Sequence, residues 1–238
     1  MTQQRRQIFC AALLLGFFLA CFAFTQPVRS QSDARADLAL VLSIDCSYSV
    51  DQREFDLQTS GTAWAFRQPE ILAAIQSGRH KRIVVSLMQW SSDEKQILAV
   101  PWMSVANAAD AEALAQKIES MPRYLADGST SISGALRFAA GVLANAPALA
   151  TRQTIDISAD GRNNAGTRTK PMRDQLIGLG IIINGLAILN EVPTLNYYFE
   201  RDVIGGLGSF VIAADNYDDF RRAIHRKLLR EIYGPGIS

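Results

Sequence analysis

The stretch LALVLSIDCSYS, residues 38–49, decides the fold of this chain. Its first part, residues 38–44, carries a single polar side chain, Ser43. An apolar run of this length is typical of a strand that is covered on both faces of a parallel sheet. We therefore expect residues 38–44 to form the central strand of an α/β domain.

An acid and two hydroxyls follow this strand at every second position. They are Asp45, Ser47 and Ser49, and Asp51 and Glu54 come next with the spacing of a capping box that opens a helix. The polar side chains are therefore expected on a strand-to-helix turn. In open α/β folds this turn lies at the carboxyl edge of the sheet, where ligands bind.

Other apolar runs predict the remaining strands, and amphipathic runs between most of them predict helices. The strands are expected at residues 83–90, 97–102, 153–158, 181–188 and 210–213, and a short helix at 193–204. Residues 91–94 are too few for a crossover helix, so the two strands beside them form an antiparallel hairpin, with Pro101 favouring an edge position. The alternation predicts a doubly wound, mostly parallel six-stranded sheet with one antiparallel edge strand and helices on both faces, as in Rossmann-like folds.

The N-terminus has the pattern of a secretory signal peptide. Arg5 and Arg6 precede a nearly unbroken apolar stretch at residues 8–24, and small residues suited to cleavage lie before Gln31. We expect residues 1–30 to be the signal peptide, and an uncleaved membrane anchor is the alternative. Residues 31–37 then form a linker, 38–233 the domain and 234–238 a C-terminal tail, and no later run is apolar enough to cross a membrane.

Charge and cysteine content limit the class of protein. Removal of residues 1–30 takes away three arginines and no acid, which changes the net charge from +1 to −2. Neither value suggests a nucleic-acid partner. Cys46 is then the only cysteine, so no internal disulfide can form, which suits a bacterial periplasmic or secreted protein. We interpret Cys46 as a small buried side chain.

Two more loops carry oxygen atoms suited to a cation. Thr130 stands at the start of an expected helix, and Asp160 follows the strand at residues 153–158. With Asp45, Ser47 and Ser49 they make a set of two carboxylates and three hydroxyls, which are ligands for Mg²⁺, or for Mn²⁺ or Ca²⁺. The alternative is an ordinary turn whose side chains bond to backbone amides.

These motifs, taken together, resemble the von Willebrand factor type A (vWA) family over roughly residues 38–233. The matching segments are DCSYS at residues 45–49, GSTSISGAL at 128–136 and SADG at 158–161. The chain looks most like the short, exported bacterial members of unknown function. The resemblance implies a metal-ion-dependent adhesion site (MIDAS), with Ser47, Ser49 and Thr130 binding the ion directly and Asp45 and Asp160 binding it directly or through water. It also implies that an acidic side chain of a partner protein completes the coordination.

The leading hypothesis is thus a metal-dependent binding module without enzymatic activity. One alternative is a Mg²⁺-dependent phosphohydrolase with Asp45 as the nucleophile, although Ser47 stands where such enzymes hold a general acid. Another is a structural domain whose site is not used.

A few further residues adjoin the expected site. Tyr48, Trp90 and Tyr124 are candidates for its rim, with packing as the alternative role, and residues 162–164 follow Asp160 closely enough to contact a ligand. Asp156 is an unusual acid within an apolar strand, for which we expect a hydrogen-bonded position at a sheet edge.

Overall fold

The computed structural model describes residues 35–126 and 128–235. In chain order, the elements are β1 (Arg35–Asp45), α1 (Gln52–Phe66), α2 (Pro69–Ser77), β2 (Ile83–Trp90), β3 (Gln96–Val105), α3 (Ala108–Glu119), α4 (Ile132–Ala144), β4 (Leu149–Ala159), α5 (Thr169–Gly178), β5 (Ile182–Ile188), α6 (Leu195–Tyr198), the π-helical turn η1 (Phe199–Val203), β6 (Val211–Ala214) and α7 (Tyr217–Tyr233). None of the helices in these residues has the length and apolar character that a bilayer span requires.

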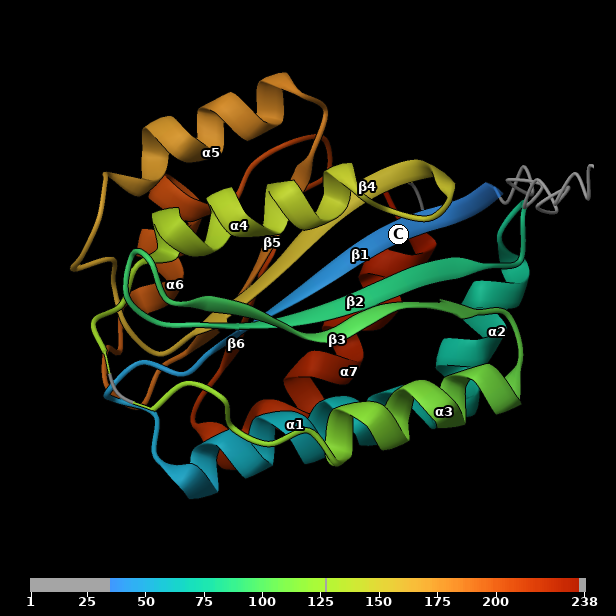
Figure 1. Ribbon diagram of the computed structural model, residues 1–238, viewed down its shortest axis with the longest axis horizontal. Helices are drawn as coiled ribbons and strands as arrows, with labels where there is room; N and C mark the ends of the chain where they lie inside the picture. Colours follow the sequence, from blue (N-terminus) through green and yellow to red (C-terminus); the bar gives the residue numbers. More distant parts are fainter. Residues whose placement is uncertain (1–34, 127, 236–238) are drawn as a thin grey trace, which may run out of the picture. The chain divides into compact units, whose positions relative to one another are not determined.

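The strands form one six-stranded sheet in the order β3-β2-β1-β4-β5-β6 (Figure 1). β3 runs antiparallel to β2 at one edge, and the other strand pairs are parallel. The expected fold class is therefore confirmed, including the single antiparallel edge strand. β1 lies inside the sheet between β2 and β4, as its apolar run predicted.

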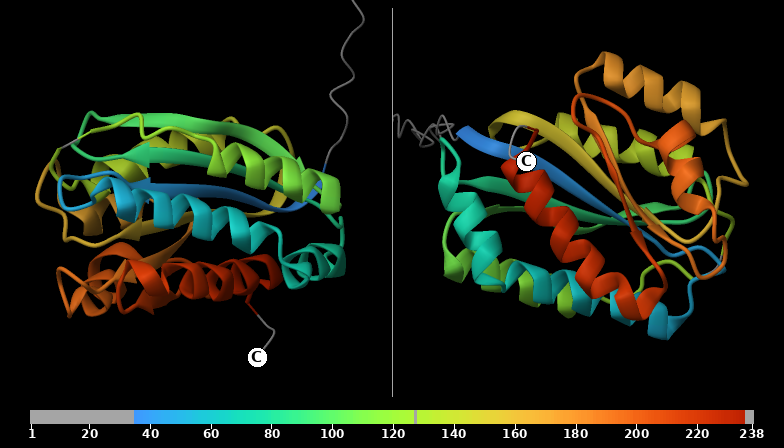
Figure 2. Two further views of the ribbon diagram at one scale, coloured as in Figure 1. Left: turned by 90° about the horizontal axis from the view of Figure 1, so that it is seen from below. Right: turned by 180° about the vertical axis from the view of Figure 1, so that it is seen from behind.

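Helices cover both faces of the sheet (Figures 1 and 2). Leu40 and Leu42 of β1 point into a core shared with α1, α2, α3 and α7. Ala39 and Val41, on the opposite face, pack into a second core with α4, α5 and α6. Both faces of β1 are covered, and successive side chains of the strand enter the two cores alternately. This explains why the apolar run is continuous.

The start of α1 is capped by Asp51 and Glu54. The Asp51 carboxylate accepts a hydrogen bond from the backbone N–H of Glu54 at 2.8 Å, and the Glu54 carboxylate accepts one from the N–H of Asp51 at 2.9 Å. The predicted capping box is thus confirmed. It sets where α1 begins and therefore how long the preceding turn is.

β1 begins at Arg35, three residues before the expected start, so residues 35–37 belong to the strand and not to the linker. Ala36 is fully buried, and the backbone N–H of Asp37 donates to the carbonyl of Arg82. The polar residues beside Ala36 hide this extension in the sequence. The signal peptide expected at residues 1–30, linker residues 31–34 and tail residues 236–238 lie outside the described part of the chain.

The short helix expected at residues 193–204 is confirmed as a continuous helical segment, in which the single turn of α6 passes directly into η1 and Phe199 and Val203 fill the core. One other expectation is wrong. Asp156 does not lie at a sheet edge, because β4 pairs with β1 on one side and β5 on the other. Its carboxylate is buried and lies 2.6 Å from the Lys227 ammonium of α7.

Candidate metal site

The loop after β1 is held in shape by the first acid. Asp45 ends the strand, and its Oδ1 accepts a hydrogen bond from the backbone N–H of Ser47 at 2.7 Å. The hydroxyls of Ser47 and Ser49 then lie 3.3 Å apart. The loop therefore turns alternate side chains toward the same point, as their spacing predicted.

The third loop meets the first one directly. Asp160 follows β4, and its Oδ1 accepts a hydrogen bond from the Ser49 hydroxyl at 2.7 Å. Its Oδ2 accepts a hydrogen bond from the Tyr217 hydroxyl at 3.1 Å. Both oxygens of this carboxylate are thus engaged by hydroxyl donors from separate elements.

The second loop adjoins the other two. The backbone N–H of Thr130 donates to Asn164 Oδ1 at 2.8 Å, and the N–H of Asn164 donates to the Thr130 carbonyl at 2.9 Å. Thr130 Oγ1 lies 3.5 Å from the position that a Cβ on Gly161 would occupy. The N–H of Tyr48 donates to the carbonyl of Gly128 at 2.9 Å, which joins this loop to the first. The structure therefore brings the three expected loops to one edge of the sheet.

The two acids of the site are buried together. Asp45 and Asp160 are fully buried, and Asp45 Oδ2 has no hydrogen-bond partner among the described residues. Burial, reinforced by the negative charge of Asp160, raises the pKa of Asp45 to about 8. Burial also raises the pKa of Asp160, while the hydrogen bonds from Ser49 and Tyr217 act in the opposite direction. A positive charge beside these groups would stabilise the ionised forms of both buried carboxyl groups.

The donor set consists of oxygens only. Within residues 35–126 and 128–235, no three His, Cys, Asp or Glu side chains are grouped to hold a metal ion. This agrees with a set in which only Asp45 and Asp160 are carboxylates and the other three members are hydroxyls. Two carboxylates and several neutral oxygens fit a hard divalent cation that keeps some of its water.

The neighbouring residues divide into two groups. Tyr48 and Tyr124 are exposed on the loops of the site, at 82% and 49%, whereas Trp90 is fully buried and packs in the core. Asn163 and Asn164 accept hydrogen bonds from backbone N–H groups at the start of α4. Trp90 is thus excluded from the rim, and the two asparagines hold the Thr130 loop in place.

Sequence reasoning missed Tyr217. It is the first residue of α7 and is separated from Asp160 by 57 positions. Burial raises the pKa of its hydroxyl, so the group stays protonated and remains a hydrogen-bond donor. No local pattern distinguishes it from a tyrosine that packs in the core, because its role depends on how α7 crosses the sheet.

Several solved structures share this fold. Proximal thread matrix protein 1 (PTMP1) from the mussel byssus has a TM-score of 0.63 at 13% identity, covering 84% of this chain and 49% of that chain. A structure of PTMP1 with a zinc-occupied MIDAS motif gives a TM-score of 0.58 at 13% identity, with the same coverage. The von Willebrand factor type A structure from Catenulispora acidiphila gives 0.57 at 13% identity, covering 83% and 43%. The pilus adhesin SpaC from Lactobacillus rhamnosus GG gives 0.52 at 15% identity, covering 83% and 31%.

These similarities establish a vWA-like fold. The chain spans about half the length of the PTMP1 chains and less of the other two. No curated protein matches the chain. One family model does match, over residues 35–236, a range that includes all of the described residues. The chain belongs to the family described as "Protein of unknown function (DUF1194)".

Proposed function

We propose that this protein is an exported, metal-dependent protein-binding module. Its divalent ion is held by Ser47, Ser49 and Thr130, with Asp45 and Asp160 as direct or water-mediated ligands. The observation that carries the proposal is the pair of buried carboxylates, one of which has an oxygen without a partner in the described residues. Buried charges of like sign need a counter-charge, and a divalent cation supplies it.

The oxygen donors suit Mg²⁺, Mn²⁺ or Ca²⁺. Mg²⁺ in particular binds through one or two carboxylates and keeps several waters. One of these waters is the position that an acidic side chain of a partner replaces. The zinc-occupied MIDAS motif of PTMP1, a protein of similar fold, supports the proposal of a divalent ion.

The surroundings of the site favour a protein partner. Tyr48 lies between two of the proposed ligands and is 82% exposed, and Tyr124 is also exposed nearby in the chain segment that leads to Thr130. Exposed tyrosines are enriched in protein interfaces because the ring packs while the hydroxyl stays solvated. The likeness to the pilus adhesin SpaC supports a role in adhesion or capture.

Binding is proposed in place of catalysis. A phosphohydrolase with an aspartyl nucleophile at Asp45 needs a general acid two residues later, and this position holds Ser47. The Ser47 side chain is buried against the hydroxyl of Ser49 and does not supply a proton with a suitable pKa.

Export belongs to the same proposal. Residues 1–30 act as the signal peptide, and the domain that follows works in the periplasm or outside a bacterial cell, as in the short exported members of the vWA family. The basic start, the apolar stretch and the single cysteine of residues 31–238 support this location.

Isothermal titration calorimetry with Mg²⁺ tests the site. Asp45→Asn removes the charge and keeps the shape, and the neutral side chain suits a buried position where ionisation is already disfavoured. We expect this variant to lose measurable Mg²⁺ binding while keeping its circular dichroism spectrum. Asp174→Asn, an exposed acid on α5, is the matched control and should bind Mg²⁺ as the natural protein does.

Partner capture tests the function. Immobilised protein is exposed to periplasmic extract with Mg²⁺, with EDTA, and with Thr130→Ala as bait. We expect a protein that is retained only by the unaltered bait in Mg²⁺. A partner that is retained equally in EDTA and by the Thr130→Ala bait contradicts the proposal. Release of phosphate from generic phosphate esters that depends on Asp45 would instead favour the phosphohydrolase alternative.

A further inference from the structure

The turn that joins β2 to β3 lies beside the loop that carries Thr130 (Figure 1). We call residues 91–95 the hairpin turn. The backbone N–H of Ser131 donates to the carbonyl of Ser91 at 2.9 Å. On the other side of Thr130, the N–H of Ser129 donates to the hydroxyl of Ser92 at 3.1 Å. The hairpin turn therefore holds both chain neighbours of a proposed metal ligand.

Asp93 is the acid of this turn that is bonded to the start of α4. Its Oδ1 accepts hydrogen bonds from the Ser131 hydroxyl at 3.0 Å and from the Arg137 guanidinium at 3.2 Å. The Ser131 hydroxyl also accepts a hydrogen bond from the N–H of Gly134 and thus caps α4. Because Ser131 is fully buried, these bonds hold its hydroxyl in one orientation. Asp93 therefore fixes the residue next to Thr130 through a side-chain contact.

Two glycines leave room for the Asp93 side chain. A Cβ on Gly134, in the first turn of α4, would lie 2.9 Å from Asp93 Oδ1. Gly166 lies in the loop after Asp160 with a φ of 71°, and a Cβ there would overlap the same carboxylate. Glycine adopts this φ without strain. Asp93 is thus packed against the two segments that carry Thr130 and Asp160.

The Thr130 loop is bonded from two sides. The N–H and the carbonyl of Thr130 pair with Asn164, and its two neighbours pair with the hairpin turn. Mg²⁺ requires near-ideal octahedral geometry, whereas Ca²⁺ accepts irregular sets of six to eight oxygens. A ligand on a loop that is fixed in this way suits the ion with the stricter geometry.

We propose that Asp93 is a positioning residue, which holds Thr130 in place through Ser131 and makes the candidate metal site prefer Mg²⁺ to Ca²⁺. The ion preference rests on the proposed function, while the positioning is a property of the protein without metal. The sequence marks residues 91–94 only as a short connection, because Asp93 and Ser131 are 38 positions apart.

Calorimetry with Mg²⁺ and with Ca²⁺ tests the preference. Asp93→Ala removes the acceptor for the Ser131 hydroxyl and should bind Mg²⁺ at least about tenfold more weakly, with less than about a threefold change for Ca²⁺. Asp93→Asn keeps an oxygen acceptor and should retain the Mg²⁺ affinity within about threefold. Glu94→Ala, at an exposed acid of the same turn, should leave both affinities unchanged. Equal losses for the two ions, or unchanged Mg²⁺ binding by Asp93→Ala, overturn the proposal.

A second variant removes the other side-chain contact of the hairpin turn. Ser92→Ala deletes the hydroxyl that accepts the bond from Ser129 and leaves Asp93 in place. It should weaken Mg²⁺ binding about threefold and again affect Ca²⁺ less. This variant tests the proposal even if Asp93→Ala does not fold, and an unchanged ratio of the two affinities counts against the hairpin turn.

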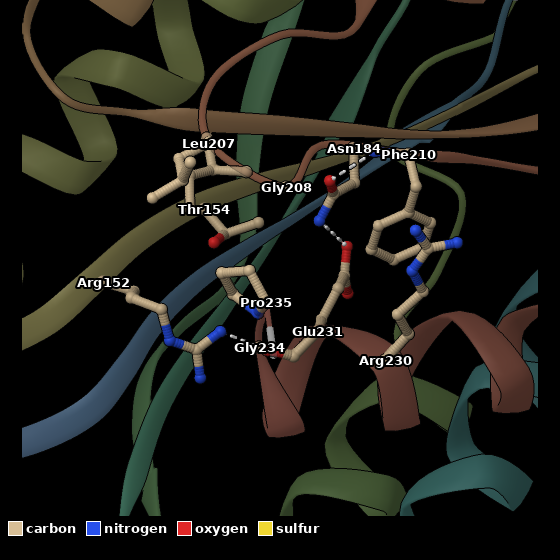
Figure 3. Close-up of a pocket in the computed structure, with 11 residues that line it drawn as sticks. Arg152, Thr154, Asn184, Leu207, Gly208, Phe210, Arg230, Glu231, Gly234 and Pro235 are labelled. Atoms are coloured by element: carbon tan, nitrogen blue, oxygen red, sulfur yellow. Dashed lines mark hydrogen bonds between the residues drawn. The ribbon is translucent and has the colours of Figure 1, made fainter. Parts of the chain in front are cut away.

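A general loss of stability has a different signature. Asn184 lies near the start of β5, where its amide donates to Glu231 Oε1 at 3.0 Å and its Oδ1 accepts from the N–H of Phe210 at 3.2 Å (Figure 3). Asn184→Ala should unfold at a lower urea concentration, because buried groups lose their partner. It should nevertheless bind both ions as the natural protein does. A matching change in ion preference in this variant would show that Asp93 acts only through stability.

Hydrogen exchange of the metal-free protein tests the positioning without an ion. The amides of Ser129 and Ser131 should exchange at least about tenfold faster in Asp93→Ala, while amides in the middle of β4 keep their rates. Unchanged exchange at Ser131 overturns the proposal even where Mg²⁺ binds. A natural protein that binds neither ion overturns the proposed function and the ion preference, and the exchange rates then decide whether Asp93 holds the loop.

Discussion

At the residue scale, Tyr217 connects the last helix to the candidate metal site. Its hydroxyl donates to Asp160 Oδ2, while the Ser49 hydroxyl donates to Oδ1. The two donors come from different parts of the fold, the loop after β1 and helix α7, and together they fix the plane of the Asp160 carboxylate. In metal sites, such outer hydrogen bonds orient a ligand before the ion binds.

Removal of this hydroxyl should therefore weaken the ion site without unfolding the protein. We expect Tyr217→Phe to lower the affinity for Mg²⁺ about tenfold, because Asp160 loses one of the bonds that orient it. The matched control is Tyr48→Phe, since Tyr48 is exposed in the site loop and should not alter Mg²⁺ binding. Calorimetry measures both variants, and equal Mg²⁺ affinity for Tyr217→Phe and the natural protein would show that Tyr217 only packs.

Lys227 is a second residue with a large expected effect. Its ammonium is fully buried and forms ion pairs with both Asp156 and Glu231. Lys227→Met should reduce the free energy of unfolding by about 3–5 kcal/mol, because two carboxylates remain without a counter-charge. Lys117→Met, at an exposed position of α3, should change it by less than about 0.5 kcal/mol. Urea unfolding of both variants gives the comparison, and similar losses would refute the role of the buried ammonium.

At the element scale, α7 makes stability depend on pH. Burial and the charge of Asp156 raise the pKa of Glu231 to about 7, against the opposing effects of Lys227 and Asn184. Because the folded-state pKa is higher than that of the unfolded chain, about 4.3, the folded state binds this proton more tightly. The resulting stability is fully present below about pH 4 and is lost as the pH rises through about 7.

The free energy of unfolding should therefore depend more steeply on pH in the natural protein than in Glu231→Gln. Between pH 5 and 7 the free energy of unfolding should fall by up to about 1.4 kcal/mol per pH unit more in the natural protein. Both proteins are unfolded in urea in metal-free buffer, so that titration of Asp45 and Asp160 contributes equally to each. Parallel profiles would contradict the pKa shift at Glu231.

The elements themselves were largely predictable from sequence. The apolar run of β1, the capping box at Asp51 and the short hairpin connection all depend on neighbours within a few residues. The start of β1 was not predicted, because a single buried apolar residue, Ala36, between two polar ones does not look like part of a strand. The pairing of Asp156 with Lys227 was missed because it depends on the crossing of α7 over β4, which no local pattern describes.

At the scale of the whole molecule, three loops distant in sequence meet at one edge of the sheet. The sequence predicted their meeting because parallel strands place their carboxyl ends together. It did not predict Tyr217 or the burial of the two acids, which follow from the packing of α7 and of the loops. The meeting of the three loops was therefore predictable from sequence, and the burial of the two acids was not.

An ion that links these loops should stabilise the whole domain. At pH 7, Mg²⁺ at about 100 times its dissociation constant should add about 2.7 kcal/mol to the free energy of unfolding, since it binds only the folded state. The melting temperature should rise with Mg²⁺ and return to its initial value with EDTA. Asp45→Asn should show no such rise, and a Mg²⁺ effect of equal size in that variant would place the ion elsewhere.

The most direct measurement is an anomalous difference map from crystals soaked in Mn²⁺, collected near the manganese absorption edge. We expect a strong peak bounded by the hydroxyls of Ser47, Ser49 and Thr130 and the carboxylates of Asp45 and Asp160. A peak at another place, or none between these three loops at saturating Mn²⁺, would contradict this expectation.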